Sequence, residues 1–427
     1  GLTVPPSPTM TPEVNCVRTL EEVEAIERRY IAPLPIWLVA WVRLRTLIAN
    51  LVVRVFRLLW FRKPAPLGSL RRVVVYAFGT LGDHLVALPA LAALRKACPN
   101  AKITLLSSTG GIGPRVLDEL LGDQRLVDAM VFVPDPPTRR RGFHVDYDPA
   151  LEGLKGCDLF VNLSPFGNRG LTNAVFRELF IARHVRARSA VGFKVKGWAG
   201  TKNLKRVLHL FVGNEPRRCG EVLAELGLVP AEPGEAVPRF PEAKARLLGN
   251  LDALQGDGPL VVLNPGSKFQ VQRWPVDRFA LVAQQIQAEG RAKIVAVGTG
   301  GERAVCERAL SGSHGLNLAG STDLQELAEL LRVAALCLTN DTGTMHLAAM
   351  VGCSTVALFT TRLSPRHWFP LGSRVAVLLA FTKDHYDYRD EGEAHDSLLA
   401  ISTERVTKIA IETLQARTPS RPTDGAP

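Results

Sequence analysis

The chain has 427 residues, of which 46% are hydrophobic and 22% charged, the make-up of a folded globular protein long enough for two domains. Its formal net charge of +11 points to anionic lipid or phosphorylated substrates as partners, and no zinc-finger, RNP-like or homeodomain pattern supports a nucleic-acid partner. The seven cysteines are odd in number, widely spaced and without a CxxC pair, which argues against a disulfide framework or structural zinc and favours a reducing cytoplasm.

Near the start, residues 1–13 are rich in Pro, Ser and Thr and are expected to be disordered, whereas residues 35–61 predict a long helix. At 100° per residue, one side of this helix collects polar residues: Arg43, Asn50, Arg54 and Arg57. Arginines interrupt the apolar run, which disfavours a membrane-spanning helix. We expect a basic amphipathic helix lying in an anionic membrane surface, with Trp37, Trp41 and Trp60 at headgroup depth. The alternative is a helix packed on the protein body or on a partner subunit.

From residue 72 onward, apolar runs alternate with helical patterns. The expected strands are 73–78, 101–106, 127–133, 159–163, 260–264, 292–297, 335–338 and 354–359. The expected helices are 84–97, 114–121, 171–184, 276–288, 302–310, 324–332, one from residue 345, and 403–416. Residues 134–151 form a Pro- and Arg-rich insertion that we expect to be a loop near a site. Such alternation predicts parallel, doubly wound sheets.

Four prolines between residues 230 and 241 suggest the link between two α/β halves. The expected division is 1–67 for the N-terminal start, helix and linker, 68–235 and 236–402 for two Rossmann-like domains, and 403–427 for a final helix and polar tail. Ligands of doubly wound sheets bind at the carboxyl ends of the strands, so we expect a cleft there between the two domains.

The first polar turn at such a strand end is residues 79–83, GTLGD. It lacks the dinucleotide fingerprint G-x-G-x-x-G. Gly79 and Gly82 would let a ligand approach the backbone around Thr80, and the Asp83 carboxylate could accept a proton from an attacking hydroxyl. The alternative interpretation of Asp83 is a helix cap.

The second and third turns follow the first two strands of the second half. Residues 264–268 carry Lys268, and Arg273 follows shortly after, so both cations could reach a diphosphate. The alternative for this pair is a basic surface loop. The third turn, residues 298–302, has three glycines, and its Glu302 could accept hydrogen bonds from a ribose.

The fourth turn lies in residues 334–352, AALCLTNDTGTMHLAAMVG, which predict a strand, a tight polar turn and a helix start. Such a helix start aims backbone N–H groups and a positive dipole end at one point, which suits a phosphate. Asp341 and Thr342 can hydrogen-bond to a ligand, Gly343 permits close approach, and His346 follows about one helical turn later. The alternative is a capped helix with a structural histidine.

Five segments together resemble glycosyltransferase family 9, the ADP-heptose lipopolysaccharide heptosyltransferases. They are AFGTLGDHLVALPALAALRKACPNAKITLL, NPGSKFQVQRWPVDRFALVA, VGTGGERA, NLAGSTDLQELAELLRVA and NDTGTMHLAAMVGCSTVALF. The resemblance runs from about residue 72 to 416. It implies a GT-B fold, with two Rossmann-like domains and the nucleotide-sugar in the C-terminal one. It also implies metal-independent transfer with inversion at the anomeric carbon.

Residue by residue, the resemblance implies that Asp83 is the catalytic base. It implies that the nucleotide-diphosphate contacts are Asp341, Thr342, Gly343 and His346, that Glu302 holds the nucleoside and that Thr322 lies near the nucleobase. The family commonly has Lys-Arg-Trp-Pro or Lys-His-Trp-Pro where this chain has Gln272, Arg273, Trp274 and Pro275. The phosphate cation is then either Lys268 or Arg273.

We therefore expect an inverting glycosyltransferase without metal or resident cofactor, peripheral on the cytoplasmic face of the inner membrane. It would move a sugar, a heptose from an ADP-sugar, onto a lipopolysaccharide-type or other lipid-linked acceptor. The alternatives are a glycosyltransferase with another NDP-sugar, a sugar-nucleotide epimerase on the same twin domains, and a non-catalytic scaffold.

Overall fold

The computed structural model describes residues 13–30, 36–108, 120, 126–134, 138–141, 144–164, 171–195, 213–252, 254, 257–290, 292–361, 365–381 and 391–416. The chain forms two compact units. We call Ala32–Pro238 with Leu363–Leu371 the N-terminal unit, and Gly1–Ile31, Arg239–Arg362 and Gly372–Pro427 the C-terminal unit. The expected segment 1–67 is therefore divided between the two units, and the chain passes from one unit to the other four times.

The sheet of the N-terminal unit has five parallel strands in the order β4-β3-β2-β7-β8. Their bounds are β2 Arg72–Tyr76, β3 Lys102–Ser108, β4 Ala129–Val133, β7 Leu159–Asn162 and β8 Ser189–Val191. The four strands predicted in this half are confirmed, and β8 is an addition. The order is that of a doubly wound sheet, whose switch point lies at the carboxyl ends of β2 and β7.

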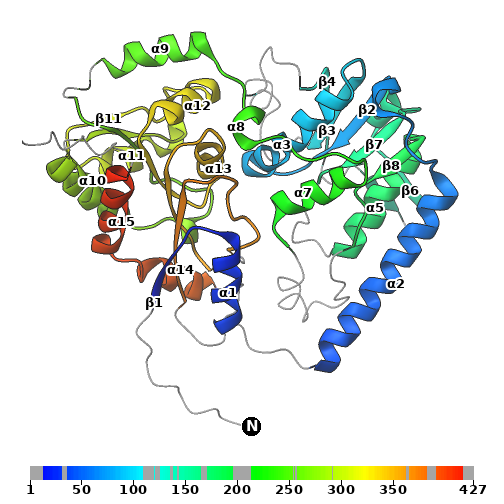
Figure 1. Ribbon diagram of the computed structural model, residues 1–427, viewed down its shortest axis with the longest axis horizontal. Helices are drawn as coiled ribbons and strands as arrows, with labels where there is room; N and C mark the ends of the chain where they lie inside the picture. Colours follow the sequence, from blue (N-terminus) through cyan, green and yellow to red (C-terminus); the bar gives the residue numbers. More distant parts are fainter. Residues whose placement is uncertain are drawn as a thin grey trace, which may run out of the picture. The chain divides into compact units, whose positions relative to one another are not determined.

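Helices cover both faces of this sheet (Figure 1). They are α2 Ile36–Trp60, α3 Leu81–Ala97, α5 Leu171–His184, α7 Glu215–Ala224 and α8 Pro233–Ala236, with 3-10 turns η1 Leu67–Ser69 and η2 Pro149–Leu154. Val74 and Tyr76 of β2 share a core with Val175 and Leu179 of α5. The helices expected at 84–97 and 171–184 are confirmed, while the helix expected at 114–121 lies almost wholly outside the described residues.

The insertion at residues 134–151 is not simply a loop, so that expectation is wrong. Strands β5 Thr138–Arg141 and β6 His144–Tyr147 pair antiparallel, with Thr138 opposite Tyr147 and Arg141 opposite His144. Pro134 and Pro149 lie outside both strands, where they remove no ladder hydrogen bond.

The predicted helix at 35–61 is confirmed as α2, and one of its faces packs on the N-terminal unit. Its Ala49 and Val53 belong to the core that includes α5. The Asn50 amide exchanges two hydrogen bonds of 2.9 Å with the backbone of Val195. Arg57 donates to the Ala190 carbonyl at 2.9 Å and pairs with Glu225 at 2.8 Å. The packing on the protein body considered from sequence therefore holds for this face.

The sheet of the C-terminal unit has seven strands in the order β1-β14-β13-β12-β9-β10-β11. Their bounds are β1 Glu13–Val17, β9 Leu260–Asn264, β10 Lys293–Ala296, β11 Gly315–Asn317, β12 Leu336–Asn340, β13 Thr355–Leu358 and β14 Val375–Phe381. Six strands are parallel in the order of a Rossmann sheet, with the switch point between β9 and β12. β1 adds an antiparallel edge strand beside β14.

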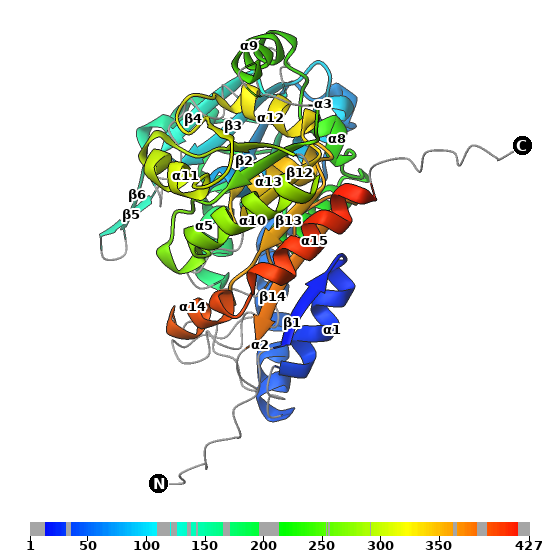
Figure 2. The same ribbon diagram turned by 90° about the vertical axis from the view of Figure 1, so that its left-hand side faces the viewer.

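The helices of this unit are α1 Leu20–Tyr30, α9 Pro241–Leu251, α10 Val276–Gly290, α11 Arg303–Ala309, α12 Leu324–Val333, α13 Gly343–Met350, α14 Glu391–Leu399 and α15 Thr403–Gln415, with 3-10 turns η4 Gln270–Gln272 and η5 Gly300–Glu302. Helices α10 and α15 lie side by side across one face of the sheet (Figure 2). Val261 and Leu263 of β9 pack against Phe279 and Ile286 of α10 in one core. Two doubly wound units confirm the predicted α/β class.

Candidate functional site

Two polar turns of the C-terminal unit meet at the switch point of its sheet, because β9 and β12 are neighbours there. The Asn340 side chain ties them together. Its Nδ2 donates to the Pro265 carbonyl at 2.9 Å and to the Gly266 carbonyl at 3.3 Å. Its Oδ1 accepts from the Trp274 backbone at 3.1 Å. Asn340 and Trp274 are thus supporting residues that sequence analysis did not single out, although both stand inside its motifs.

A second asparagine holds the start of α13 in place. Asn264 Oδ1 accepts from the hydroxyls of Thr339 at 3.2 Å and of Thr342 at 3.0 Å. Thr342 is the N-cap of α13, and Gly343 is its first residue. The N-terminus of α13 therefore lies at the carboxyl edge of the sheet, where the backbone N–H groups and the dipole of a helix start stabilise an anion.

Asp341 directly precedes the N-cap of α13 and His346 lies in the first turn of that helix, but their environments differ. Asp341 is half-buried, and its Oδ2 accepts a hydrogen bond of 3.1 Å from the Gln272 amide. His346 is 4% exposed, and burial lowers its pKa to about 4. The ring is therefore neutral at physiological pH, so it can act toward a ligand only as a neutral donor or acceptor.

The third turn places Glu302 against the second. Glu302 Oε2 accepts from the Thr299 backbone at 2.8 Å and from the Thr299 hydroxyl at 2.9 Å. A Cβ built on Gly266 would lie 2.1 Å from Glu302 Oε1, so only glycine lets the 264–268 turn pass beside this carboxylate. The structure thus brings together Glu302 with the Asn264, Asp341 and Thr342 cluster at one edge.

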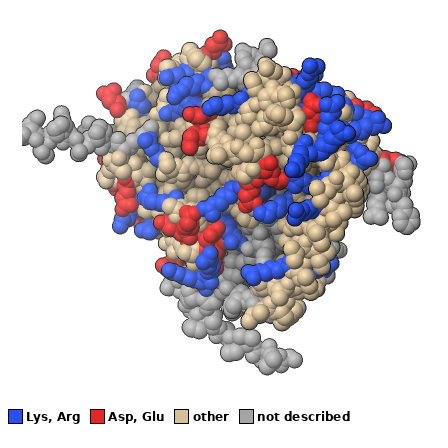
Figure 3. Space-filling view, turned by 45° about the vertical axis from the view of Figure 1, so that its right-hand side comes forward, with Lys and Arg blue, Asp and Glu red and all other residues tan. Residues whose placement is uncertain are grey.

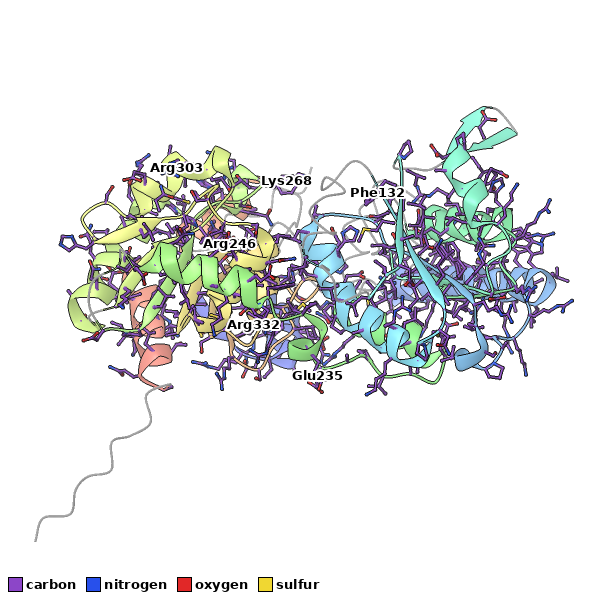
Figure 4. The ribbon with its side chains drawn as sticks, turned by 90° about the horizontal axis from the view of Figure 1, so that it is seen from above. Phe132, Glu235, Arg246, Lys268, Arg303 and Arg332 are labelled. Atoms are coloured by element: carbon purple, nitrogen blue, oxygen red, sulfur yellow. The ribbon has the colours of Figure 1, made fainter. Side chains whose placement is uncertain are left out.

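Lys268 and Arg273 belong to the same second turn, but their side chains differ in exposure and in hydrogen bonding. The Lys268 side chain is exposed, and its Nζ lies 5.7 Å from the centre of the Phe269 ring. Arg273 is half-buried, and its Nε donates to the Ser267 carbonyl at 2.8 Å. In Figure 4, Lys268 projects from this unit, and Arg303 from α11 is labelled on the same unit. Lys268 forms no ion pair with any residue that the structure describes.

Thr322 lies on the loop after β11, at the same edge of the sheet. This loop packs on the third turn, because a Cβ on Gly320 would lie 2.6 Å from Gly300 Cα, and Gly320 has a φ of +72°. Thr322 is half-buried and directly precedes Asp323, the N-cap of α12. It is therefore carried by the turn that neighbours Glu302.

In the N-terminal unit, the turn after β2 forms a reciprocal capping box. Asp83 Oδ2 accepts hydrogen bonds from the Thr80 backbone and, at 2.8 Å, from the Thr80 hydroxyl. Gly79 has a φ of +138°, and a Cβ there would lie 2.2 Å from Asp83 Oδ2. Gly82 is buried in the first turn of α3. The carboxylate of Asp83 therefore does cap α3, and this cap also fixes the position from which it could accept a proton.

The other oxygen of this carboxylate, Oδ1, accepts no hydrogen bond from the residues that the structure describes. Burial raises the pKa of Asp83, against the hydrogen bonds from Thr80, while the charge of His84 lowers it and that of Glu215 raises it. His84 is fixed by hydrogen bonds of 2.8 Å from Nδ1 to the Thr80 carbonyl and between Nε2 and the Ser107 hydroxyl. A fixed carboxylate with one unoccupied oxygen and raised proton affinity is suited to general-base chemistry.

A cavity of about 890 Å³ lies elsewhere in the C-terminal unit. Apolar side chains of α9, α10 and α15 line it, together with Leu260, Lys293 and Ala335. These three residues lie at the amino-terminal ends of β9, β10 and β12, so the cavity opens at the edge opposite the polar turns. Among the described residues, no group of three or more His, Cys, Asp or Glu side chains could hold a metal ion.

Comparison with known proteins agrees with this arrangement. The model of glycosyltransferase family 9 (heptosyltransferase) matches residues 219–397, which include the three turns of the C-terminal unit but not Asp83. Lipooligosaccharide heptosyltransferase 2 of Haemophilus influenzae is 28% identical over 189 residues, covering 42% of this chain and 52% of that protein. Lipopolysaccharide heptosyltransferase 2 of Escherichia coli K12 is 30% identical over 166 residues, covering 37% and 47%. The matched region thus spans about half the length of these curated relatives.

Solved structures extend the likeness of fold to most of the chain. A glycosyltransferase family 9 protein from Veillonella parvula has a TM-score of 0.58 at 21% identity, covering 84% of this chain and 100% of that one. The Escherichia coli ADP-heptose lps heptosyltransferase II has a TM-score of 0.55 at 20% identity, covering 81% and 99%. The predicted GT-B class is confirmed by the likeness of fold, and residues 219–397 match the model of glycosyltransferase family 9.

Proposed function

We propose that this protein is an inverting glycosyltransferase that moves a sugar from a nucleotide-sugar to a hydroxyl of a lipid-linked acceptor. The observation that carries the proposal is the Asp83 carboxylate, which Thr80 holds through Oδ2 while Oδ1 stays unoccupied by described residues. The acceptor oxygen attacks the anomeric carbon, the bond from that carbon to the diphosphate breaks, and the acceptor proton passes to Asp83 Oδ1. One displacement of this kind inverts the anomeric centre.

The edge of the C-terminal unit supplies the donor site in this proposal. The start of α13 at Thr342 and Gly343 faces the diphosphate, and Asp341 and His346 flank it. Lys268 is the cation we propose for the charge that grows on the leaving diphosphate, because it is exposed and has no ion pair among the described residues. Arg273 supports the loop through Ser267. Glu302 accepts from the ribose, with Thr322 close to the nucleobase.

The two curated relatives named above are heptosyltransferases, and one of the similar structures is an ADP-heptose enzyme, so we propose ADP-heptose as donor and a lipopolysaccharide-type glycan as acceptor. Thermal shifts with ADP, UDP and GDP, free and sugar-linked, test the identity of the nucleotide, and selective stabilisation by UDP would contradict an ADP-sugar donor.

NMR of the anomeric configuration of the product tests whether transfer inverts the anomeric carbon. Full activity after treatment with a chelator is expected for metal-independent transfer. Turnover of the donor without any acceptor would instead support an epimerase.

We further propose that α2 holds the enzyme on an anionic membrane, at the cytoplasmic face of the inner membrane. Ten large apolar side chains of α2 are 37–88% exposed: Ile36, Trp37, Leu44, Leu47, Ile48, Leu51, Val52, Val55, Leu58 and Leu59. At 100° per residue, most of them lie opposite the face that packs on the protein. Figure 3 shows the corresponding band of uncharged residues. Isolated exposed apolar residues are common, but a continuous stripe of this kind indicates an interaction surface.

The charged residues of α2 support an anionic lipid surface as the partner of its exposed apolar stripe. Residues 36–60 contain no Asp or Glu, and Arg43 and Arg54 flank the stripe on one side. On the other side, the Arg45 guanidinium lies 4.4 Å from the centre of the Trp41 ring, an amphipathic pair suited to headgroup depth. Among the described residues, α2 is the helix long and apolar enough to cross a membrane. Since one face packs on the N-terminal unit, we propose that α2 lies in the surface instead.

Sedimentation with vesicles tests this contact. The full chain should bind vesicles containing phosphatidylglycerol more strongly than pure phosphatidylcholine vesicles, and salt should weaken the binding. The triple variant Leu47→Glu, Leu51→Glu and Leu58→Glu should lose it. The matched control is Val229→Glu, Leu248→Glu and Leu281→Glu, which changes three exposed apolar residues outside α2 and should bind normally. Unchanged vesicle binding by the α2 variant, or loss of an oligomer instead, would contradict the proposal.

A further inference from the structure

A buried ionisable cluster lies beside the turn of Asp83, and the reaction proposed above does not use it. It consists of Glu215 and Arg218 from the first turns of α7 and His367 from the segment Leu363–Leu371. Their side chains are 2%, 5% and 10% exposed. Burying three ionisable groups is costly unless they satisfy one another, so their placement calls for a physical reason.

The backbone of the His367 segment is fixed on the N-terminus of α7. The Asn214 amide donates to the Arg366 carbonyl at 2.9 Å and to the Phe369 carbonyl at 3.3 Å. The Glu215 backbone N–H donates to the His367 carbonyl at 3.1 Å. These bonds use donors that a helix start leaves unpaired, and they hold His367 in place independently of its own ring.

The ring itself is oriented by a third contact. His367 Nδ1 donates to the Gly213 carbonyl at 3.0 Å, so in the neutral ring Nε2 carries the lone pair. Nε2 lies 3.7 Å from Glu215 Oε1. Glu215 Oε2 is occupied by Arg218 Nε at 2.5 Å, and Arg218 also donates to the Leu163 carbonyl at 2.6 Å. Glu215 therefore divides its carboxylate between a permanent cation and a titratable one.

Helix α7 packs against α3, which carries Asp83, and the charges of the two helices act on each other. The Glu215 charge raises the pKa of Asp83. Burial lowers the pKa of His367, and Glu215, the Gly213 carbonyl and Asp83 oppose this, while Arg218 adds to it. The neutral ring is therefore favoured at physiological pH, and the Glu215 charge then acts on Asp83 with Arg218 as its neighbouring cation.

We propose that His367 is a positioning residue for Asp83, in which the charge of the ring on α7 sets how strongly the carboxylate on α3 attracts a proton. With the neutral ring, the field of Glu215 makes Asp83 a stronger base. A protonated ring, donating from Nε2 toward Glu215, cancels that field and weakens the base. This inference rests on the proposed role of Asp83, but the coupling between the two groups can be measured without any substrate.

The direct test is an NMR titration of the His367 ring in the full chain, with its signal identified by its loss in His367→Asn. Removing the Asp83 charge with Asp83→Asn should move the His367 titration midpoint to lower pH, because the ring loses a neighbouring anion. The matched control is Asp148→Asn, which removes one carboxylate from the same unit at an N-cap where asparagine serves equally well. It should leave the midpoint unchanged. An unmoved midpoint in Asp83→Asn would overturn the inference.

Transfer kinetics give the second readout. In His367→Asn the amide nitrogen replaces Nδ1 as donor to Gly213, so the melting temperature should stay close to native. We expect kcat close to native at neutral pH, where the native ring is already neutral, an unchanged KM for the donor, and an acid limb of the pH profile displaced to higher pH. A loss that is equal at every pH would mean a purely structural role and would overturn the inference. Full transfer by Asp83→Asn would instead overturn the proposed function, whatever the titration shows.

Discussion

Two turns in this molecule carry the same local motif in different surroundings. Thr80 and Asp83 form a reciprocal capping box after β2, and Thr299 and Glu302 form one after β10. In each, one carboxylate oxygen accepts from both the backbone and the hydroxyl of the threonine, and in each the carboxylate presses on a glycine, Gly79 or Gly266. The motif is thus a positioning device that fixes a carboxylate at the end of a strand.

What differs is the charge around each carboxylate. Asp83 lies beside His84 and near Glu215 and His367, and burial raises its pKa. Glu302 lies on an exposed turn, beside loops that carry Lys268 and the start of α13. The comparison teaches that the same cap can position a base in one unit and a ligand contact in the other, and that surroundings decide between the two.

The largest effects are expected when each carboxylate is neutralised in turn, which tests whether Asp83 and Glu302 have different roles. Asp83→Asn should lower kcat by about 10³-fold with little change in donor affinity, because the acceptor proton loses its base while the asparagine oxygen can still cap α3. Glu302→Gln should instead raise the donor KM with kcat nearly unchanged. Steady-state transfer kinetics measure both. Comparable kcat losses in the two variants would refute the division of roles.

The paired glycines offer the next test. Gly79→Ala should lower kcat by about 10²-fold, because the new methyl displaces the Asp83 carboxylate at a backbone position with positive φ. Gly266→Ala should displace Glu302 and act on the donor KM. Both variants are to be compared with Gly249→Ala, where a Cβ meets nothing within 4 Å and no kinetic change is expected. If Gly266→Ala lowered kcat and Gly79→Ala did not, the roles proposed for Asp83 and Glu302 would be reversed.

A smaller effect is expected at the cation of the donor site. Lys268→Ala should weaken ADP binding by about 10- to 30-fold, since hydrogen bonds to charged groups contribute about 1.5–3 kcal/mol and this one is solvent-exposed. Calorimetry with ADP measures this loss of affinity. Raising the salt concentration should reduce the difference in ADP affinity between the native chain and Lys268→Ala. Lys408→Ala removes an exposed lysine of α15 and serves as the control. If Arg273→Ala weakened ADP binding while Lys268→Ala did not, Arg273 would be the phosphate cation.

The smallest expected effect is on stability, and its sign follows from the raised pKa of Asp83. The folded chain holds this proton more tightly than the unfolded chain does, so the stabilisation is present at low pH and is lost as pH rises through the folded-state pKa. At neutral pH, Asp83→Asn should therefore raise the melting temperature, on the order of 2 °C, and the gain should vanish in acid. Calorimetric scans at several pH values measure it. A melting temperature lowered at neutral pH would show that capping outweighs burial.

Much of this architecture could be read from local patterns. Strand β9 and helix α5 match their predicted bounds, because a fully buried strand is a continuous apolar run and an amphipathic helix repeats every 3.6 residues. Signals for two missed elements were present as well. Asn214 followed by Pro216 is typical of a helix start, here of α7, and VAVLLAF is a buried strand, here β14.

Other features depend on contacts between residues far apart in the chain. The turns of Asn264 and Asn340 could be grouped from sequence because both follow strands, but their hydrogen bonds require β9 and β12 to be neighbours. Nothing in the sequence spacing places His367 beside Glu215, 152 positions earlier, since the segment that carries it interrupts the C-terminal unit. Local periodicity carries no information on such pairings.

The pairing of β1 with β14 has a consequence for biosynthesis and handling. All seven residues of β14 are apolar and buried, and β1 covers the edge that they would otherwise expose. The two strands are separated by about 360 residues, so during synthesis β1 leaves the ribosome long before its partner exists. An expression boundary placed after Val17 would leave an unguarded apolar edge, ready to pair with a second chain. The short N-terminal strand thus acts as a built-in protection against aggregation.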